Sequence, residues 1–556
     1  MSIVTTILEF LGSLGFLLYG MKLMSDGVQK SAGEKLQRAL SVVTGNRFAG
    51  LLTGLVVTMI IQSSGATTVM VVTFVNAGLM SVTQSVGVTF GANIGTTITA
   101  WIVSIFGFNF KISAFAIPVF GIGYFLSIIR KHKYTNLGEA IMGFGMLFFG
   151  LSGLSDVFTI NPESLERMEW FFKIQNLGFI SIIIGFVIGI AITALLHSSS
   201  AFSAIVITMA YNRLITWEMA AAMTLGSNIG STIDAILAAM GCSTDAKRAA
   251  LIHVMFNFFG TILALIFFKP FLNLIVLLTP GHEVISNIAI RISVLHTVFK
   301  VLSTVVLLPM SKYLVKLSQI IIKDRKKAED PNVYRLDFVE APIGKESATA
   351  YIIRVEKAIA DMTDIVSDMF DRIQIGCTKR NKEFAAEHLP ASEREEDYVD
   401  QMHEQITHYL VKCEHLPLTE KQLDHISSMI QIVDELENMS DHCYTTTVLL
   451  ARSVEKNMTF PSEDMERMLP YVELARQFLQ FIHRNINTQL TPEKLELAKE
   501  LENGIDAFKK DLKKVARKRL EGGADVKAEL LYIDLVRQIE KIGDNCFSIS
   551  EQLVTF

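Results

Sequence analysis

An all-α protein in two parts is predicted: a polytopic membrane domain of two inverted repeats with re-entrant helical hairpins, followed by a helical bundle. Three features of the sequence support this expectation. Hydrophobic residues make up 50% of the chain and the mean hydropathy is +0.38, which is high for a soluble protein. Charged residues are sparse up to about Leu317 and dominate from Lys323 onward. Polar motifs inside the apolar part occur twice in the same order.

The duplicated motifs keep one spacing. The first copy begins with a polar break in an apolar run, Gln62-Ser63-Ser64-Gly65. A second apolar run follows and leads to Gly91-Ala92-Asn93-Ile94-Gly95 and then Thr96-Thr97-Ile98-Thr99. The same order returns, at one constant offset, in His197-Ser198-Ser199-Ser200 and in Gly226-Ser227-Asn228-Ile229-Gly230 followed by Ser231-Thr232-Ile233-Asp234. A third match, Ser25-Asp26 with Ser155-Asp156, has a slightly smaller offset. Self-similarity at a fixed spacing indicates a duplicated structural unit.

The apolar runs predict the spans of the membrane domain, because about 20 apolar residues cross a bilayer. Phe48 to Leu79 and Phe179 to Tyr211 carry the polar breaks, and their flanks of about 13 residues predict hairpins. The expected domains are 1–320 for the membrane domain, with repeats at about 10–130 and 137–268 and an extra span at 285–308, then a linker at 321–345 and a helical domain at 346–556. Full spans are expected at Val4 to Met24, Val86 to Phe106, Ile112 to Ile129, Leu137 to Leu154, Met219 to Met240, Ala249 to Phe268 and Ile285 to Leu308.

Loop charges predict the orientation. With both hairpins returning to their own side, the basic segments from Lys22 to Arg47, at Arg130 to Lys133 and at Lys247-Arg248 share one face, and the acidic segment from Asp156 to Glu169 takes the other. The positive-inside rule then places the N-terminus outside and the C-terminal domain in the cytoplasm. The expected location is the cell membrane, which is the inner membrane where a cell has two. Each repeat has three crossings, an odd number, so the second repeat is inserted upside down relative to the first. Inverted repeats of this kind are the architecture of secondary transporters.

The polar breaks predict binding sites. A serine tip that starts a new helix presents hydroxyl and free amide N–H groups at a positive dipole end, which suits an anion. The broken helices offer hard oxygens from Asn93, Thr96, Thr97, Thr99, Asn228, Ser231, Thr232 and Asp234, which suit Na⁺, with the glycines letting the helix unwind. Small residues also serve close helix packing, which is the alternative reading. Two further polar pairs lie four residues apart and so share a helix face: His253 with Asn257, and His296 with Lys300. We expect them to form hydrogen bonds between helices rather than to take part in transport.

The paired serine and Gly-x-Asn-Ile-Gly motifs resemble the type II sodium-phosphate cotransporter family over about residues 10 to 310. The resemblance implies Na⁺-driven phosphate uptake, with sodium held by the oxygens named above. It also places phosphate at Gln62, Ser63, Ser64, His197, Ser198, Ser199 and Ser200. Gly65 stands where the family often has a third serine, and His197 replaces a glutamine. Asp234 stands where vertebrate members have threonine, either as a Na⁺ ligand or paired with a basic group such as Lys300.

The charged half of the chain predicts six long helices in two three-helix units. An internal match within this half places the carboxylate pairs Glu437/Asp441 and Glu540/Asp544 at i, i+4 spacing. Such pairs repel unless a metal ion or a neighbouring Arg or Lys lies between them. The pattern resembles the PhoU family, which implies a divalent or trivalent metal and a regulatory role. The five cysteines show no metal-binding spacing and are expected as reduced thiols.

Together these observations predict a sodium-coupled phosphate importer that works by alternating access and carries a cytoplasmic regulatory domain. A membrane-anchored phosphate sensor and a Na⁺-coupled carrier of another small anion are the alternatives. Phosphate, sodium and the lipid bilayer are the expected partners, with a homo-oligomer or a signalling protein as further candidates. Nucleic acid is not expected, because the net charge of −5 is spread over both halves. No nucleophile and base pattern or phosphate-binding glycine loop occurs, so an enzyme is not expected.

Overall fold

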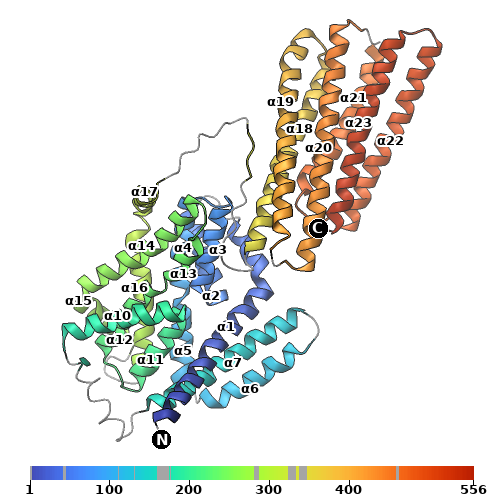
Figure 1. Cartoon of the computed structure of the whole chain (residues 1–556). Coiled ribbons are helices and arrows are strands. Elements are labelled where there is room, and N and C mark those ends of the chain that lie inside the picture. Colours follow the sequence, from blue (N-terminus) through green and yellow to red (C-terminus); the bar gives the residue numbers. More distant parts are fainter. Residues whose placement is uncertain are drawn as a thin grey trace. The chain divides into compact units, whose positions relative to one another are not determined.

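The computed structural model describes residues 3–41, 46–109, 112–129, 132–159, 174–175, 177–280, 287–323, 333–336, 347–416, 418–458 and 462–555. Helices are the only regular secondary structure in these ranges. The chain divides into two compact units (Figure 1), an N-terminal unit formed mainly by residues up to Arg325 and a C-terminal unit formed mainly by residues from Ala348. The all-α prediction is therefore confirmed.

The N-terminal unit contains the broken helices that the motifs predict. Two-residue breaks at Gln62-Ser63 and at His197-Ser198 separate α2 from α3 and α10 from α11. Its helices are α1 (Ile3–Ser41), α2 (Arg47–Ile61), α3 (Ser64–Asn76), α4 (Val82–Gly95), α5 (Thr97–Asn109), α6 (Ile112–Ser127), α7 (His132–Phe158), α10 (Phe179–Leu196), α11 (Ser199–Tyr211), α12 (Trp217–Gly230), α13 (Ile233–Ala239), α14 (Thr244–Ile266), α15 (Phe268–Leu278), α16 (Ile288–Leu307) and α17 (Ser311–Ile321).

Six helical segments of this unit are long and apolar enough to cross a membrane: Val4–Ser31, Val82–Gly107, Tyr134–Phe158, Phe179–Leu196, Thr244–Ile266 and Ile288–Leu307. Five of them match predicted spans. The expected span from Met219 to Met240 is instead interrupted between α12 and α13, and the one at Ile112 to Ile129 is a helix of 16 residues. The hairpin limb α10 has 18 residues, so the prediction that each limb is too short to cross is wrong for this limb.

One further prediction needs correction, and others fall partly outside the described residues. The basic segment from Lys22 is not a loop, because α1 continues as helix to Ser41. Of the acidic segment from Asp156 to Glu169, the residues after Thr159 lie outside the described residues, as do Arg130 and Lys131 of the second basic segment. The loop charges on which the predicted orientation rests are thus described only in part, and the orientation stays a prediction.

Glycines bring the helices of each repeat into close contact. A Cβ at Gly91 would collide with the carbonyl oxygen of Leu51, and one at Gly226 would collide with that of Phe186, which is the equivalent contact in the second repeat. Gly95 approaches Leu55 in the same way. The glycines therefore pack α4 on α2 and α12 on α10. They do not unwind the helix over a long stretch, since α4 runs through Gly95 and α5 begins at Thr97. Packing, the alternative reading, is correct for these glycines.

The C-terminal unit contains the six predicted helices. They are α18 (Ser347–Thr378), α19 (Lys382–Cys413), α20 (Glu420–Glu455), α21 (Ser462–Asn485), α22 (Pro492–Glu521) and α23 (Val526–Thr555). Thr419 and Gln422 form a capping box at the start of α20, and Thr491 caps α22. The apolar positions that recur at helical spacing form one buried core, and Ser548 of α23 donates a hydrogen bond to Glu435 of α20. This contact joins the two helices that carry the duplicated carboxylate motif.

Candidate functional site

The two serine tips have the same backbone geometry. Gln62 and His197 end α2 and α10 in the left-handed conformation, with φ of 62° and 51°. Ser63 and Ser198 then act as N-caps, and their hydroxyls accept hydrogen bonds from the amides of Ala66 and Ala201 at 3.1 and 3.2 Å. The first amides of α3 and α11 stay available, as at any helix N-terminus. Each tip therefore presents amide N–H groups and neighbouring serine hydroxyls at a positive helix end.

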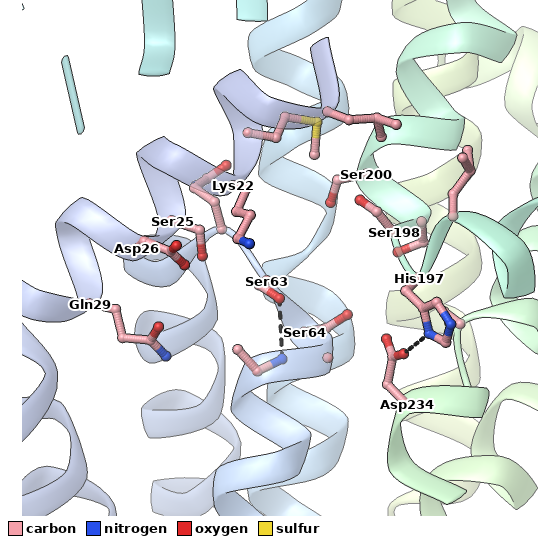
Figure 2. A pocket seen from close by; sticks show the side chains of 18 residues that line it. Lys22, Ser25, Asp26, Gln29, Ser63, Ser64, His197, Ser198, Ser200 and Asp234 are labelled. Atoms are coloured by element: carbon pink, nitrogen blue, oxygen red, sulfur yellow. Dashed lines mark hydrogen bonds and ion pairs between the residues drawn. The ribbon is translucent and has the colours of Figure 1, made fainter. Parts of the chain in front are cut away.

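Both tips line one cavity of about 410 Å³. All seven residues predicted for anion binding are among its lining residues, together with Ser231 and Asp234 (Figure 2). The third wall is α1, which was not predicted as part of the site: Lys22, Ser25, Asp26 and Gln29 project toward the tips in Figure 2. One signal in the sequence pointed to this wall, since Ser25-Asp26 belongs to the duplicated pattern.

Each tip is tied to the broken helix of its own repeat at equivalent positions. The Thr99 hydroxyl donates to Gln62 Oε1 at 2.9 Å, and Asp234 Oδ1 contacts His197 Nδ1 at 2.7 Å. Both members of the second pair follow those of the first at the constant offset of the duplicated motifs. The basic partner of Asp234 is thus His197 and not Lys300, whose ammonium donates to Asn93 and Asn257.

The carboxylate of Asp234 also lies close to Gly65. A Cβ at Gly65 would lie 2.8 Å from Asp234 Oδ2, closer than real Cβ contacts come. Gly65 belongs to the first tip and Asp234 to the second broken helix, so this contact crosses between the repeats. A serine at position 65 would displace this carboxylate oxygen, and glycine leaves room for it.

The oxygens predicted for Na⁺ lie at the breaks between α4 and α5 and between α12 and α13. Several hydroxyls return to the backbone of the preceding turn: Thr97 donates to Ile94 O at 2.8 Å, Thr232 to Ile229 O at 2.8 Å and Ser231 to Asn228 O at 2.9 Å. Only Ser231 and Asp234 of the predicted cation set reach the cavity. The structure therefore brings the second broken helix to the anion cavity and leaves the first one away from it.

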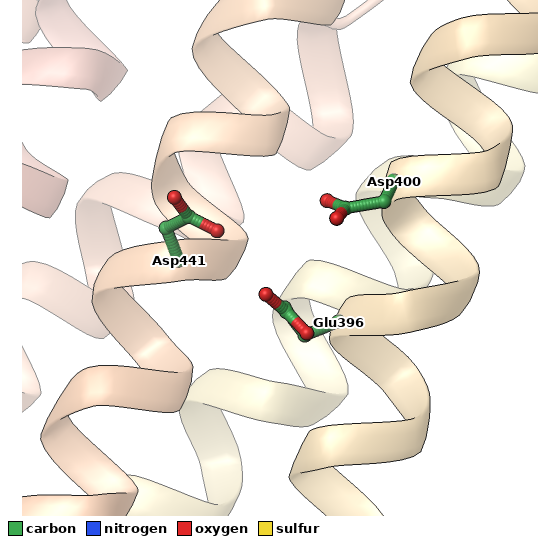
Figure 3. A group of neighbouring side chains, drawn as sticks. All are labelled: Glu396, Asp400 and Asp441. Atoms are coloured by element: carbon green, nitrogen blue, oxygen red, sulfur yellow. The ribbon is translucent and has the colours of Figure 1, made fainter.

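A cluster of carboxylates in the C-terminal unit brings α19 and α20 together. Carboxylate oxygens of Glu396, Asp400 and Asp441 lie within 4.8 Å of one another (Figure 3). Glu437 lies one turn before Asp441 on α20. Prediction from sequence found the α20 pair and missed the α19 pair, although Glu396 and Asp400 have the same i, i+4 spacing. Convergent carboxylates of this kind fit a hard cation such as Mg²⁺ or Ca²⁺.

The second predicted carboxylate pair has a different environment. Lys509 of α22 lies against Glu540 and also contacts Asp506 at 3.2 Å. Burial and Glu540 raise the pKa of Asp544 to about 6, and Lys509 opposes this rise. Of the two alternatives weighed for these pairs, a lysine partner is therefore correct for Glu540.

The carboxylates of the first cluster resist ionisation together. Burial, together with the nearby charges of Asp400 and Asp441, raises the pKa of Glu396 to about 7. Burial also raises the pKa of Asp441, with Asp400 adding to it. The folded chain therefore holds the proton on Glu396 more tightly than the unfolded chain does. Protonation of Glu396 stabilises the fold fully below about pH 4.5, and this contribution is lost as the pH rises through about 7.

We expect Glu396→Gln to stabilise the C-terminal unit at pH 8 in the presence of a chelator. The gain should be about 1 kcal/mol after solvent screening, or about 2–4 °C in melting temperature, and it should vanish at pH 4. The measurement is labelling of the buried thiol of Cys443 during heating of the full chain. Asp434→Asn, which removes a carboxylate paired with His403 outside the cluster, is the control. Equal melting of Glu396→Gln and wild type at pH 8 would contradict mutual repulsion.

The fold and the cavity define a class of protein. Apolar helices of membrane-spanning length surround broken helices whose polar tips meet at one anion-suited cavity, and this combination is typical of secondary transporters. The comparisons with known proteins agree. The model of the Na⁺/Pi-cotransporter family matches residues 16–156 and 175–287, and that of the PhoU domain matches residues 359–446. The N-terminal unit of this chain belongs to the Na⁺/Pi-cotransporter family, and its C-terminal unit contains a PhoU domain.

Relatives with assigned names cover different parts of the chain. Uncharacterized protein YqeW of Bacillus subtilis is 28% identical over 316 residues, which are 57% of this chain and 98% of that protein. "Putative inorganic phosphate export protein YjbB" of Salmonella typhimurium is 23% identical over 65% of this chain and 64% of its own length. Sodium-dependent phosphate transport protein 2C of Rattus norvegicus is 39% identical over 90 residues, 16% of this chain and 15% of that protein. No solved structure matches the chain.

Proposed function

We propose that the protein carries inorganic phosphate into the cell together with Na⁺ by alternating access. The observation that supports this most directly is the convergence of both serine tips, with their amide N–H groups, on one cavity with Lys22 opposite them. Phosphate is bound by the amides and hydroxyls at the two helix starts, Ser63 to Gly65 and Ser198 to Ser200, and its charge is balanced by Lys22. Gln62 and His197 hold the tips in place through Thr99 and Asp234.

Coupling to sodium follows from charge. Importing a divalent anion against an inside-negative potential costs about 4.6 kcal/mol per 100 mV, because each elementary charge costs about 2.3 kcal/mol. Sodium ions that enter with phosphate offset this cost. Asp234 and Ser231 supply oxygens for Na⁺ at the cavity wall, so that the cation and the anion bind side by side.

The two copies of the Ser-Asp motif support alternation. In this structure Ser25 and Asp26 of α1 line the cavity, whereas Ser155 of α7 accepts a hydrogen bond from Asn212 of α11 at 3.1 Å. One copy therefore borders the cavity, whereas the serine of the other copy is hydrogen-bonded to a neighbouring helix. Inverted repeats that exchange these two roles would move the opening to the other side of the membrane. The proposed orientation has the N-terminus outside and the C-terminal unit in the cytoplasm of an inner-membrane protein.

The C-terminal unit is proposed as the regulator of transport. Its carboxylate cluster at Glu396, Asp400 and Asp441 would hold a divalent or trivalent metal ion, which would remove the repulsion between these side chains. Glu437, one turn before Asp441, is a further candidate ligand. Deletion of the unit is expected to leave the cavity intact and to change the external phosphate level at which uptake stops. A homo-oligomer or a cytoplasmic signalling protein would receive the signal.

The decisive experiment is uptake of labelled phosphate into proteoliposomes under an inward Na⁺ gradient, with K⁺ as the substitute cation. We expect accumulation only with Na⁺, and a strong loss in Ser198→Ala, which removes the cap of the second tip. Ser127→Ala is a matched control, because its hydroxyl only returns to the backbone of α6. Binding without accumulation would identify a sensor. Competition by arsenate, sulfate or a carboxylate would identify another anion, and efflux under an outward phosphate gradient with no effect of Na⁺ would identify an exporter.

Substitution of Gly65 tests the contact between the repeats. We expect Gly65→Ala to push the Asp234 carboxylate away from His197 and to lower the apparent Na⁺ affinity of uptake about 10-fold, a coupling of about 1.4 kcal/mol. In an Asp234→Thr background the same change should cost less than about 3-fold, since the crowded oxygen is gone. The measurement is a double-mutant cycle of uptake against Na⁺ concentration. Additive effects of the two substitutions would contradict the contact.

A further inference from the structure

A lysine lies in the core of the N-terminal unit with its charge bound by neutral groups. Lys300 of α16 is 2% exposed, and its ammonium donates to Asn93 Oδ1 of α4 at 2.8 Å and to Asn257 Oδ1 of α14 at 2.7 Å. The ammonium also lies 5.7 Å from the ring centroid of Phe256 and 5.5 Å from that of Phe299. In the part of the chain that the structure describes, no carboxylate pairs with it. A buried charge held in this way needs strongly oriented dipoles.

Both amides are oriented toward the ammonium by their own helices. The Asn93 amide nitrogen donates to Thr89 O at 2.9 Å, and that of Asn257 donates to His253 O at 3.0 Å. With the nitrogens thus engaged, the side-chain oxygens face Lys300. Two oriented oxygens that meet at a single positive charge are also what a small, hard monovalent cation would require.

The second repeat has the same asparagine without the lysine. The Asn228 amide nitrogen donates to Thr224 O at 3.0 Å, which is the equivalent of the bond between Asn93 and Thr89. Among the described residues no lysine ammonium donates to the Asn228 side-chain oxygen, and the side chain is 1% exposed. Equivalent positions therefore differ in one respect: Asn93 of the first repeat accepts a hydrogen bond from the Lys300 ammonium of α16, and Asn228 of the second repeat has no such partner among the described residues.

We propose that the Lys300 ammonium takes the place of a sodium ion at Asn93, so that sodium binds only at the break between α12 and α13 of the second repeat. This inference rests on the proposed sodium-coupled transport. A tethered cation keeps the charge of the first site without exchanging with solution. Each transport cycle then moves one Na⁺ fewer than it would if both broken helices bound an ion.

The experiment uses Lys300→Met, which keeps much of the side-chain volume and removes the charge and its donors. We expect the ratio of labelled Na⁺ to labelled phosphate taken up by proteoliposomes to rise by one Na⁺ per phosphate, because the oxygens of Asn93 and Asn257 become free for sodium. Lys316→Met, at an exposed position of α17, is the matched control and should keep the wild-type ratio. An unchanged ratio in Lys300→Met would overturn the inference.

Sodium binding is measured separately from transport by the melting temperature of the purified protein in NaCl against choline chloride. Lys300→Met should show a larger sodium-dependent rise in melting temperature than wild type and Lys316→Met, because it would bind one more sodium ion. An equal rise in all three proteins would overturn the inference even if none of them transports phosphate. If Lys300→Met cannot be purified in folded form, Asn93→Asp decides. In Asn93→Asp the Lys300 ammonium neutralises the new carboxylate at position 93, so we expect no additional dependence of the melting temperature on sodium. An additional dependence would overturn the inference.

Discussion

Replacement of Gly91 by alanine is expected to prevent stable folding of the N-terminal unit. The new Cβ would collide with the carbonyl oxygen of Leu51, and neither backbone can move without separating α4 from α2. Overpacking in a core commonly costs about 1–3 kcal/mol, and a contact between two backbones should reach at least the upper end of this range. The measurement is the fraction of monodisperse protein in detergent together with its melting temperature.

Glycine elsewhere in the same unit provides the control. A Cβ at Gly121 of α6 meets nothing within 4 Å, so Gly121→Ala should be neutral or stabilise the helix by up to about 1 kcal/mol. Gly226→Ala, the equivalent of Gly91→Ala in the second repeat, should be as harmful as Gly91→Ala, because its Cβ would collide with Phe186 O. Equal melting temperatures for Gly91→Ala and Gly121→Ala would show that close packing of α4 on α2 is not required.

Lys22→Ala is expected to weaken the apparent affinity for phosphate about 10- to 100-fold. Lys22 is the basic side chain that α1 contributes to the cavity, opposite the two serine tips. A hydrogen bond to a charged group contributes about 1.5–3 kcal/mol, which corresponds to this range of affinity. The measurement is the KM for phosphate at saturating Na⁺ in proteoliposomes, with phosphate binding to the purified protein as a second readout.

Lys30 provides a control on the same helix. Its ammonium contacts Glu139 of α7 at 2.8 Å, and it is not among the residues that line the cavity. Lys30→Ala should therefore leave the KM for phosphate unchanged, and Lys22→Arg should retain most of the affinity because the charge is kept. A normal KM in Lys22→Ala would mean that the tips alone bind the anion.

Prediction from sequence worked best where a repeated spacing carried the information. The constant offset between the duplicated motifs located both tips, and the structure places all their predicted residues on one cavity. The same offset relates the contacts of Gln62 with Thr99 and of His197 with Asp234, although spacing alone did not indicate that these side chains meet. In the C-terminal unit, apolar residues at helical spacing predicted all six helices, because each helix buries one face in a common core.

Other features depended on contacts between segments far apart in the sequence. The α1 wall of the cavity, the approach of Gly65 to Asp234 and the α19 carboxylates beside Asp441 each join helices that no local pattern relates. The partner of Lys300 is a further example. Pairing of Lys300 with Asp234 was one of two alternatives from the sequence, yet the lysine donates to two asparagine oxygens and the aspartate contacts a histidine.

The sequence by itself determined the all-α fold, the membrane character of the first half, the duplicated breaks and the residue types available at each break. These properties follow from local composition and periodicity, which act within one helix or one repeat. Tertiary structure alone decided which charges meet and which oxygens face the cavity. The reason is that electrostatic contacts depend on distances across helices, and the close packing at Gly91 and Gly226 sets those distances.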